Sequence, residues 1–255
     1  SSTGGATITT SGLVWGASTN PEITLTTKTT DGTTSGTFTS SITGLTQGTT
    51  YYVRAYATNY LGTSYGPNST FTTLTTPTIS ATVSATSITS STATIGGTIT
   101  ADGGAAVTAR GVVYGTSSLS STFSVTSGTG TGTYTISLTG LTPATTYYAR
   151  SFATNSVGTV YGTETSFATI AIAPSLTTTA ASSITKYAAS AGGTITSNGG
   201  SVITASGICW STTSTPTTSN SKTTDGTTSG TFTSSVTGLT AGTTYYVRAY
   251  ATNAI

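Results

Sequence analysis

Residues 28–59 read KTTDGTTSGTFTSSITGLTQGTTYYVRAYATN, and residues 222–253 carry the same stretch again. The two copies differ only at two positions, Ile42/Val236 and Gln47/Ala241. A looser copy between them ends in GLTPATTYYARSFATN at residues 140–155. Self-similarity at a fixed period identifies a tandem array before any residue chemistry is considered. The chain is therefore predicted to be a string of small modules.

The period is about 96–98 residues, because equivalent places are taken by Tyr51, Tyr147 and Tyr245. A chain of 255 residues then holds three modules. We expect a first module over residues 1–74 that is N-terminally incomplete, a complete module over 75–170, and a third over 171–255 that is C-terminally incomplete. Gly4-Gly5 aligns with Gly103-Gly104, which places the start of module one after its second strand.

The complete middle copy shows seven short runs typical of strands, separated by turn signals. No stretch has a sustained 3.6-residue apolar period, so no substantial helix is expected. Seven strands in a module of this size predict an all-β, Ig-like antiparallel sandwich of two sheets. The expected strands are Ile79–Val83, Thr92–Ile99, Ala109–Tyr114, Phe123–Thr126, Thr133–Leu138, Tyr147–Asn155 and Thr159–Ala168. The Asp-Gly pairs at 31, 102 and 225 are read as tight turns.

Residues 141–147, LTPATTY, resemble the corner before strand F of fibronectin type III domains. The resemblance implies that the Tyr147 hydroxyl bonds back to the backbone near Leu141, a tyrosine corner. The other copies keep the Leu and Tyr but replace the Pro with Gln47 or Ala241. The Trp usual on strand B of eukaryotic members is missing, and the middle copy has Ile95 or nearby residues there.

The whole chain more closely resembles the Thr/Gly-rich modules repeated in very large secreted surface proteins of Bacteroidota. Those modules place a short Gly-led strand before the Tyr/Arg strand. Here the Gly-led strands are Gly12–Trp15, Gly111–Tyr114 and Gly207–Trp210. The resemblance implies an extracellular, cell-surface location and a part in adhesion or in a filament.

The composition argues against most chemistry. Charged residues make up 5% of the chain, His is absent, and the formal net charge is +2. Acid–base catalysis needs paired carboxylates or a His, zinc needs His or several Cys, and nucleic acid needs a basic cluster. We therefore expect no enzyme activity, no cofactor, no metal, no nucleic-acid partner and no membrane span. The single Cys209 replaces the Val of the other copies and is interpreted as a small buried hydrophobe.

One constellation has functional promise, a row of aromatic and Arg side chains on the Tyr/Arg strand. Alternation along a strand places Tyr51, Val53, Ala55 and Ala57 toward the core and the intervening residues outward. An Arg between two rings favours stacking, and exposed aromatic rows also bind sugars. The alternative is that the row only stabilises the sheet face. The row comprises Tyr52, Arg54, Tyr56, Tyr148, Arg150, Phe152, Tyr246, Arg248 and Tyr250.

The linkers contain Pro and no Gly, which favours a semi-rigid rod with Ile170 and Ile172 buried at the second joint. We expect a non-enzymatic repeat segment that forms a stalk or fibre of a bacterial surface adhesin or filament. Its partners would be neighbouring modules, with lateral self-association or a glycan as further possibilities. The alternative is a spacer or carbohydrate-binding module of a secreted polysaccharide-degrading enzyme. The strands missing from the end modules are expected in flanking chain or from another chain.

Overall fold

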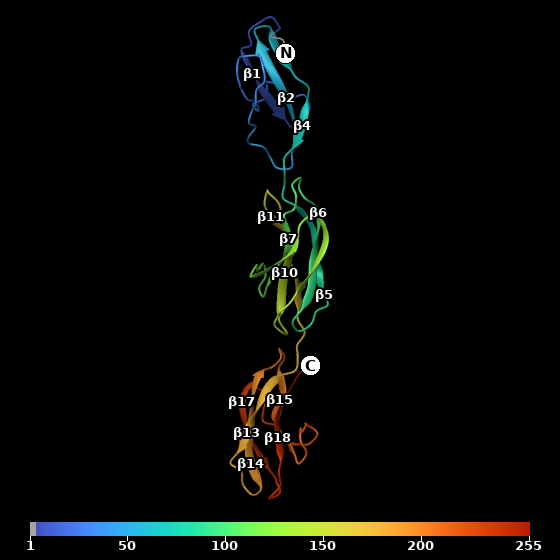
Figure 1. Ribbon diagram of the computed structural model, residues 1–255, viewed down its shortest axis with the longest axis vertical. Helices are drawn as coiled ribbons and strands as arrows, with labels where there is room; N and C mark the ends of the chain where they lie inside the picture. Colours follow the sequence, from blue (N-terminus) through green and yellow to red (C-terminus); the bar gives the residue numbers. More distant parts are fainter. Residues whose placement is uncertain (1–3) are drawn as a thin grey trace.

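The computed structural model describes residues 4–255, and all regular structure in that range is β. Three β bodies follow one another along the longest axis of the molecule (Figure 1). Strand pairing occurs within residues 10–72, 78–168 and 175–253, and no described sheet combines strands from two of these ranges. The all-β prediction is confirmed. The limits at 74/75 and 170/171 stay a prediction, and residues 1–3 of the first predicted module lie outside the described residues.

The middle body is a sandwich of two antiparallel sheets. One sheet has the order β5-β6-β9, and the other has the order β11-β10-β7-β8, with β12 also on β10. The core between them includes Ile95 and Ile99 of β6 and Val112 of β7, each at most 1% exposed. The strands are β5 Thr78–Thr86, β6 Ala93–Ala101, β7 Ala109–Gly115, β8 Phe123–Gly128, β9 Gly132–Leu138, β10 Thr146–Thr154, β11 Thr159–Tyr161 and β12 Thr165–Ala168.

Six of the expected strands of this body are found with small shifts at their ends, and the seventh is divided. The run 159–168 forms two strands, and both pair with β10: β11 opposite Phe152–Thr154 and β12 opposite Thr146–Ala149. Between them the Gly162 amide donates to the Ser151 carbonyl at 2.9 Å. A Cβ at Gly162 would lie 2.4 Å from Ser151 Oγ, so a glycine is required where the edge strand bends over β10.

The tyrosine corner is confirmed in all three copies. Tyr147 is 4% exposed, and its hydroxyl oxygen accepts a hydrogen bond from the Thr142 amide at 3.0 Å. The Tyr51 hydroxyl accepts from Thr46 at 3.1 Å, and the Tyr245 hydroxyl accepts from Thr240 at 3.2 Å. The corner therefore forms with or without the Pro that precedes it in the middle copy.

The third body repeats this architecture with fewer strands. One sheet has the order β13-β14-β17 and the other β16-β15-β18. Its core includes Ile208, Val236 and Cys209, each at most 1% exposed. The strands are β13 Ser175–Ser182, β14 Ala188–Ser197, β15 Ile203–Ser211, β16 Ser221–Lys222, β17 Gly230–Thr237 and β18 Tyr246–Asn253.

The first body contains a single sheet among the described residues. Its strands are β1 Thr10–Gly16, β2 Thr50–Asn59, β3 Gly62–Tyr65 and β4 Ser69–Thr72. β2 pairs with β1 on one side and with β3 and β4 on the other. Residues 36–43 belong to no strand, although their sequence differs from that of β17 only at Ile42, which is Val236 in β17.

The three Asp-Gly pairs are not equivalent. Gly103 and Gly104 have positive φ, and the Gly104 amide donates to Asp102 Oδ1 at 2.9 Å, so the predicted turn is present. Gly226 has no positive φ, and the reading of Asp225-Gly226 as a tight turn is wrong. The Asp225 carboxylate instead accepts hydrogen bonds from the hydroxyls of Thr223 and Ser234. It therefore ties the edge segment to β17.

The expected burial of two isoleucines at the second joint is also wrong. Ile170 is 56% exposed and Ile172 is 41% exposed. The joint is held through their backbone: the Ile170 amide donates to Thr89 O at 3.0 Å and the Ile172 amide donates to Gly199 O at 2.8 Å.

Candidate functional site

The predicted Tyr/Arg row lies on three equivalent strands, β2, β10 and β18. Each pairs with a Gly-led strand, β1, β7 or β15, in the same register: Tyr56 lies opposite Gly12, Phe152 opposite Gly111 and Tyr250 opposite Gly207. In the middle copy, Tyr147, Ala149 and Ala153 belong to the core cluster, as the alternation predicts. The members of the row therefore lie on the opposite face of the sheet.

The guanidinium groups of the first two copies stack on a neighbouring strand rather than between the rings of their own strand. Arg54 Cζ lies 4.5 Å from the centroid of Tyr65, the last residue of β3. Arg150 Cζ lies 4.7 Å from the centroid of Tyr161, the last residue of β11. A cation this close to a ring face contributes about 0.5–1 kcal/mol at a partly exposed site. These arginines therefore fasten the edge strand to the sheet.

Arg54 and Arg150 also donate hydrogen bonds to backbone carbonyls. Arg54 Nε donates to Gly66 O at 3.0 Å, which holds the chain just after β3. Arg150 Nη2 donates to Leu119 O at 3.3 Å, and this carbonyl belongs to the loop between β7 and β8. Arg248 is exposed, and within residues 4–255 no ring stacks on it. The three arginines thus share a position but not an environment.

The outward aromatic row is interrupted at its third position. Tyr56 is 4% exposed, Phe152 is 9% exposed and Tyr250 is partly buried, so the expectation of an open row does not hold there. The Tyr56 hydroxyl donates to Thr29 O at 2.7 Å, and the Tyr250 hydroxyl donates to Thr223 O at 2.6 Å. Each ring belongs to a residue opposite a Gly of the paired strand, and the two Tyr hydroxyls are bonded to the edge segments that contain Thr29 and Thr223.

The glycines opposite these rings leave room for that arrangement. A Cβ at Gly111 would lie 2.7 Å from Phe152 Cε1 and 2.1 Å from Val125 O. The first aromatic position remains more open: Tyr52 and Tyr148 are partly exposed, and Tyr246 is 47% exposed. The accessible rings are therefore Tyr52 in the first module, Tyr148 in the middle module, and Tyr246 with part of Tyr250 in the third.

The sequence reasoning missed the tyrosines that receive the arginines. The signal was present as a second repeated motif, Tyr-Gly at 65–66 and 161–162, which begins three residues after Gly62 and Gly158. It also missed the Arg110 guanidinium, whose Cζ lies 5.0 Å from the Tyr134 ring centroid. Tyr134 is 6% exposed and its hydroxyl donates to Gly111 O at 2.6 Å. Burial raises the pKa of Tyr134 above its ordinary value.

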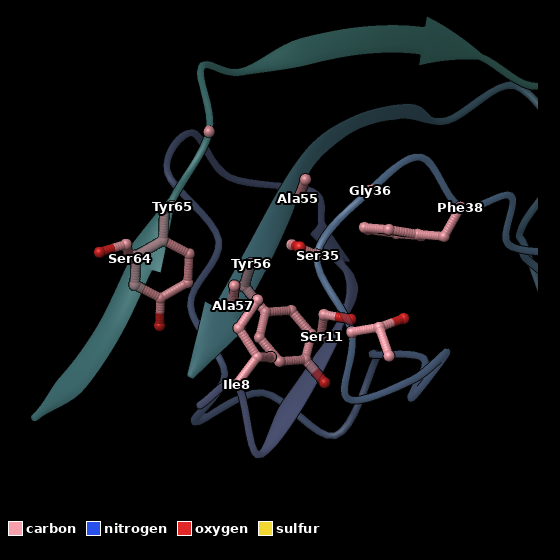
Figure 2. Close-up of a pocket in the computed structure, with 12 residues that line it drawn as sticks. Ile8, Ser11, Ser35, Gly36, Phe38, Ala55, Tyr56, Ala57, Ser64 and Tyr65 are labelled. Carbon is pink, nitrogen blue, oxygen red and sulfur yellow. The ribbon is translucent and has the colours of Figure 1, made fainter. Parts of the chain in front are cut away.

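A hollow of about 370 Å³ lies on the opposite, core-facing side of β2 in the first body (Figure 2). Its lining residues include Ile8, Phe38, Ala55, Ala57, Tyr56 and Tyr65. Ala55 is exposed here, whereas its equivalent Ala249 in the third body is 5% exposed. The side that forms the interior of the other two bodies is therefore open in the first.

The interpretation of Cys209 as a small buried hydrophobe is confirmed. It is 1% exposed, and its Sγ lies 3.3 Å from Arg248 O. Burial raises the pKa of the thiol, which disfavours the nucleophilic thiolate. Within residues 4–255, no three Cys, Asp or Glu side chains gather into a group that could hold a metal ion. In the same range, no helix is long and apolar enough to cross a membrane.

Comparison with known proteins identifies no family for this chain. No family model matches the chain, and no curated protein matches it. Among solved structures the chain is similar to the FN1–FN3 domains of chicken CNTN1, at 14% sequence identity, covering 99% of this chain and 86% of that one. The TM-score is 0.30, too low for an argument. The assignment of all-β sandwich modules therefore rests on the strand pairing described above.

Proposed function

We propose that this chain is a non-enzymatic extracellular repeat segment that forms a semi-rigid stalk or fibre of a bacterial surface adhesin or filament. The observation that carries the proposal is the construction of the two joints, where the linker is hydrogen-bonded to the module on either side. A linker held on both sides transmits orientation from one module to the next, as a stalk requires.

At the first joint, the Thr73 amide donates to Thr49 O at 3.1 Å, which holds the linker to the preceding module. Two residues later the Thr75 amide donates to Gly103 O at 2.9 Å, which holds it to the next. The side chain of Asn155 then donates to Thr75 O at 2.7 Å and to Asp102 O at 2.8 Å. Only residue 74 separates the two anchored peptide groups.

The second joint has the same design. The Thr169 amide donates to Thr145 O at 3.1 Å, and the Ile172 amide donates to Gly199 O at 2.8 Å. Asn253 Nδ2 donates to Ile172 O at 2.7 Å and to Asn198 O at 2.9 Å. A Cβ at Gly200 would lie 2.2 Å from the Cβ of Ala144, so the two modules touch beside the linker. Direct contact limits the angles that the joint can adopt.

The stalk is tested in two steps. Small-angle scattering of residues 1–255 should require a narrow range of angles between modules, and a broad range would contradict the proposed rigidity. Antibodies against the chain should then label intact cells, at a regular spacing if the modules build a filament. Labelling only after lysis would exclude a surface stalk. Specific binding on a glycan array, lost when Tyr52, Tyr148 and Tyr246 are replaced by Ala, would instead favour the carbohydrate-binding alternative.

A further inference from the structure

Two stretches that differ at a single position have different conformations in this molecule. Residues 230–237, GTFTSSVT, form β17 and pair with β14 over eight positions, from Ala188 to Ile195. Residues 36–43, GTFTSSIT, differ by one methylene group and belong to no strand. A strand requires a partner for its backbone hydrogen bonds. The first module thus carries a segment with strand sequence and no strand partner among the described residues.

In the third module the strand that pairs with β17 is β14, which contains two successive glycines, Gly192 and Gly193. Gly193 of β14 lies opposite Phe232 of β17. A Cβ at Gly192 would lie 2.2 Å from Phe232 O, and a Cβ at Gly193 would lie 2.7 Å from the Cβ of Ala249. The middle module repeats this: Cβ atoms at Gly96 and Gly97 would lie 1.9 Å from Tyr134 O and 2.6 Å from Ser151 Cβ. β14 therefore needs two successive glycines where it lies against β17 and β18. β6 needs them in the same way where it lies against β9 and β10.

The strand beyond the glycines also makes a specific contact. Thr178 Oγ1 of β13 accepts a hydrogen bond from the Ala249 amide at 3.0 Å. Thr82 Oγ1 of β5 accepts one from the Ser151 amide at 3.0 Å. The equivalent residue of the first module is Ala55. A complete partner is therefore a hairpin with a Thr on its first strand and Gly-Gly-Thr-Ile-Thr on its second, as in β5–β6 and β13–β14.

Burial shows what this hairpin does. Ser234, Val236 and Ala249 are 2%, 1% and 5% exposed beneath it. Their counterparts Ser40 and Ile42 are only partly buried, and Ala55 is exposed. Phe38, the counterpart of Phe232, lies beside Ala55 in the open hollow of Figure 2. The groove thus leaves Ala55 exposed, whereas Phe38 is partly buried, as Phe232 is in the third module.

We propose that the core-facing side of the first module is a docking groove for a polypeptide β-hairpin of this Thr/Gly-Gly-Thr-Ile-Thr type. The hairpin adds antiparallel to residues 36–43 and converts them into a strand, which is recognition by β-augmentation. Main-chain hydrogen bonds supply the attraction, and the two glycines supply the selectivity because larger residues collide with Phe38 and Ala55. The proposal does not depend on the stalk function, since it concerns the completion of one module by a peptide.

The test uses the chain of residues 1–255 and a synthetic peptide of residues 173–198, which contains β13 and β14. Calorimetry should show saturable binding of one peptide per chain. Hydrogen exchange of the amides of residues 37–43 should slow at least about tenfold in the complex. A peptide with Gly192→Val and Gly193→Val should bind at least about tenfold more weakly. In the chain, Ala55→Arg should abolish both the binding of the native peptide and the slowing of hydrogen exchange in residues 37–43. Thr70→Arg on exposed β4 should leave both unchanged.

Because a free hairpin peptide orders poorly, a second arm joins the same 173–198 segment in front of Ser1 through a flexible linker, which raises its effective concentration. Slow exchange of residues 37–43 with the native segment, and fast exchange with the Val variant, supports the proposal. Fast exchange with the native segment in both arms overturns it. Equal binding of the native and Val peptides overturns it as well. A dimer of the chain alone that protects residues 37–43 would identify a second copy as the occupant and also overturn it.

Discussion

At the scale of single residues, the same side chain has different neighbours in different modules. Arg150 stacks on Tyr161 and donates to Leu119 O, whereas the equivalent Arg248 is exposed without such a ring in residues 4–255. The difference follows from the edge strand: β11 supplies the Tyr in the middle module. The equivalent position in two related strands therefore does not give the arginine the same contacts.

Replacing Arg150 and, in a separate variant, Arg248 by Ala provides a matched pair of stability measurements. Arg150→Ala should lower the free energy of unfolding of the middle module by about 1 kcal/mol, because the stacking on Tyr161 and the packing of the long side chain are both lost. Arg248→Ala, which loses no stacked ring, should change the third module by less than about 0.5 kcal/mol. Hydrogen exchange in β10 and in β18 reports the two modules separately. Equal losses in both would show that the ring contributes nothing.

A pH-dependent contact joins the loop between β7 and β8 to the edge of the sheet. The Leu119 amide and the Ser118 hydroxyl donate to Glu164, and these bonds hold the pKa of this carboxyl below its ordinary value of 4.5. Since the folded pKa is lowered, the contact is fully present above the unfolded value and is lost as the pH falls through the folded value. The amide resonance of Leu119 should therefore titrate below 4.5. Glu164→Gln should remove that titration, and a midpoint at or above 4.5 would contradict the contact.

At the scale of elements, a strand here exists only where another strand receives it. β17 and residues 36–43 share their side chains almost completely, yet only β17 lies against β14. Intrinsic preference for the extended conformation is similar in the two segments, so it does not decide between them. Pairing decides, because each backbone amide and carbonyl of an interior strand needs a partner.

A glycine in β14 tests this dependence. Gly193→Val places Cβ within 2.7 Å of Ala249 Cβ and 2.6 Å of Thr177 O, and it should destabilise the third module by about 3 kcal/mol. The amides of residues 231–237 should then exchange as fast as those of residues 37–43. Gly226→Ala is the control, since a Cβ there meets nothing within 4 Å and φ is not positive. Unchanged protection of β17 in the Gly193 variant would show that it forms without correct packing on β14.

At the scale of the whole molecule, the three modules follow one another along the longest axis and are joined by short linkers (Figure 1). Each linker is anchored by backbone hydrogen bonds on both sides and by an Asn side chain of the following module, Asn155 or Asn253. The shape of the molecule therefore depends on a few polar contacts and little on buried apolar surface at the joints.

Removing one such contact should loosen one joint. Asn155→Ala leaves the carbonyls of Thr75 and Asp102 without their donor, at a cost of about 1–3 kcal/mol. Distances measured between spin labels on the first and middle modules should broaden, while those between the middle and third modules should not. Asn68→Ala, which removes a surface bond to Asn20 within the first module, is the control. An unchanged distribution in the Asn155 variant would assign the rigidity to other contacts.

The sequence by itself determined the repeat, the strand runs of the middle module, the tyrosine corners and the burial of Cys209. The tyrosine corners were implied by the resemblance of residues 141–147 to fibronectin type III domains, and the other features follow from local alternation, turn chemistry and comparison of the copies, which need no knowledge of distant residues. The tertiary structure decided which arginines receive a ring, that Phe152 and Tyr56 are covered, that Ile170 and Ile172 are exposed, and that residues 36–43 form no strand. The physical reason is that each of these depends on a partner remote in sequence. Two nearly identical stretches therefore differ according to what lies against them.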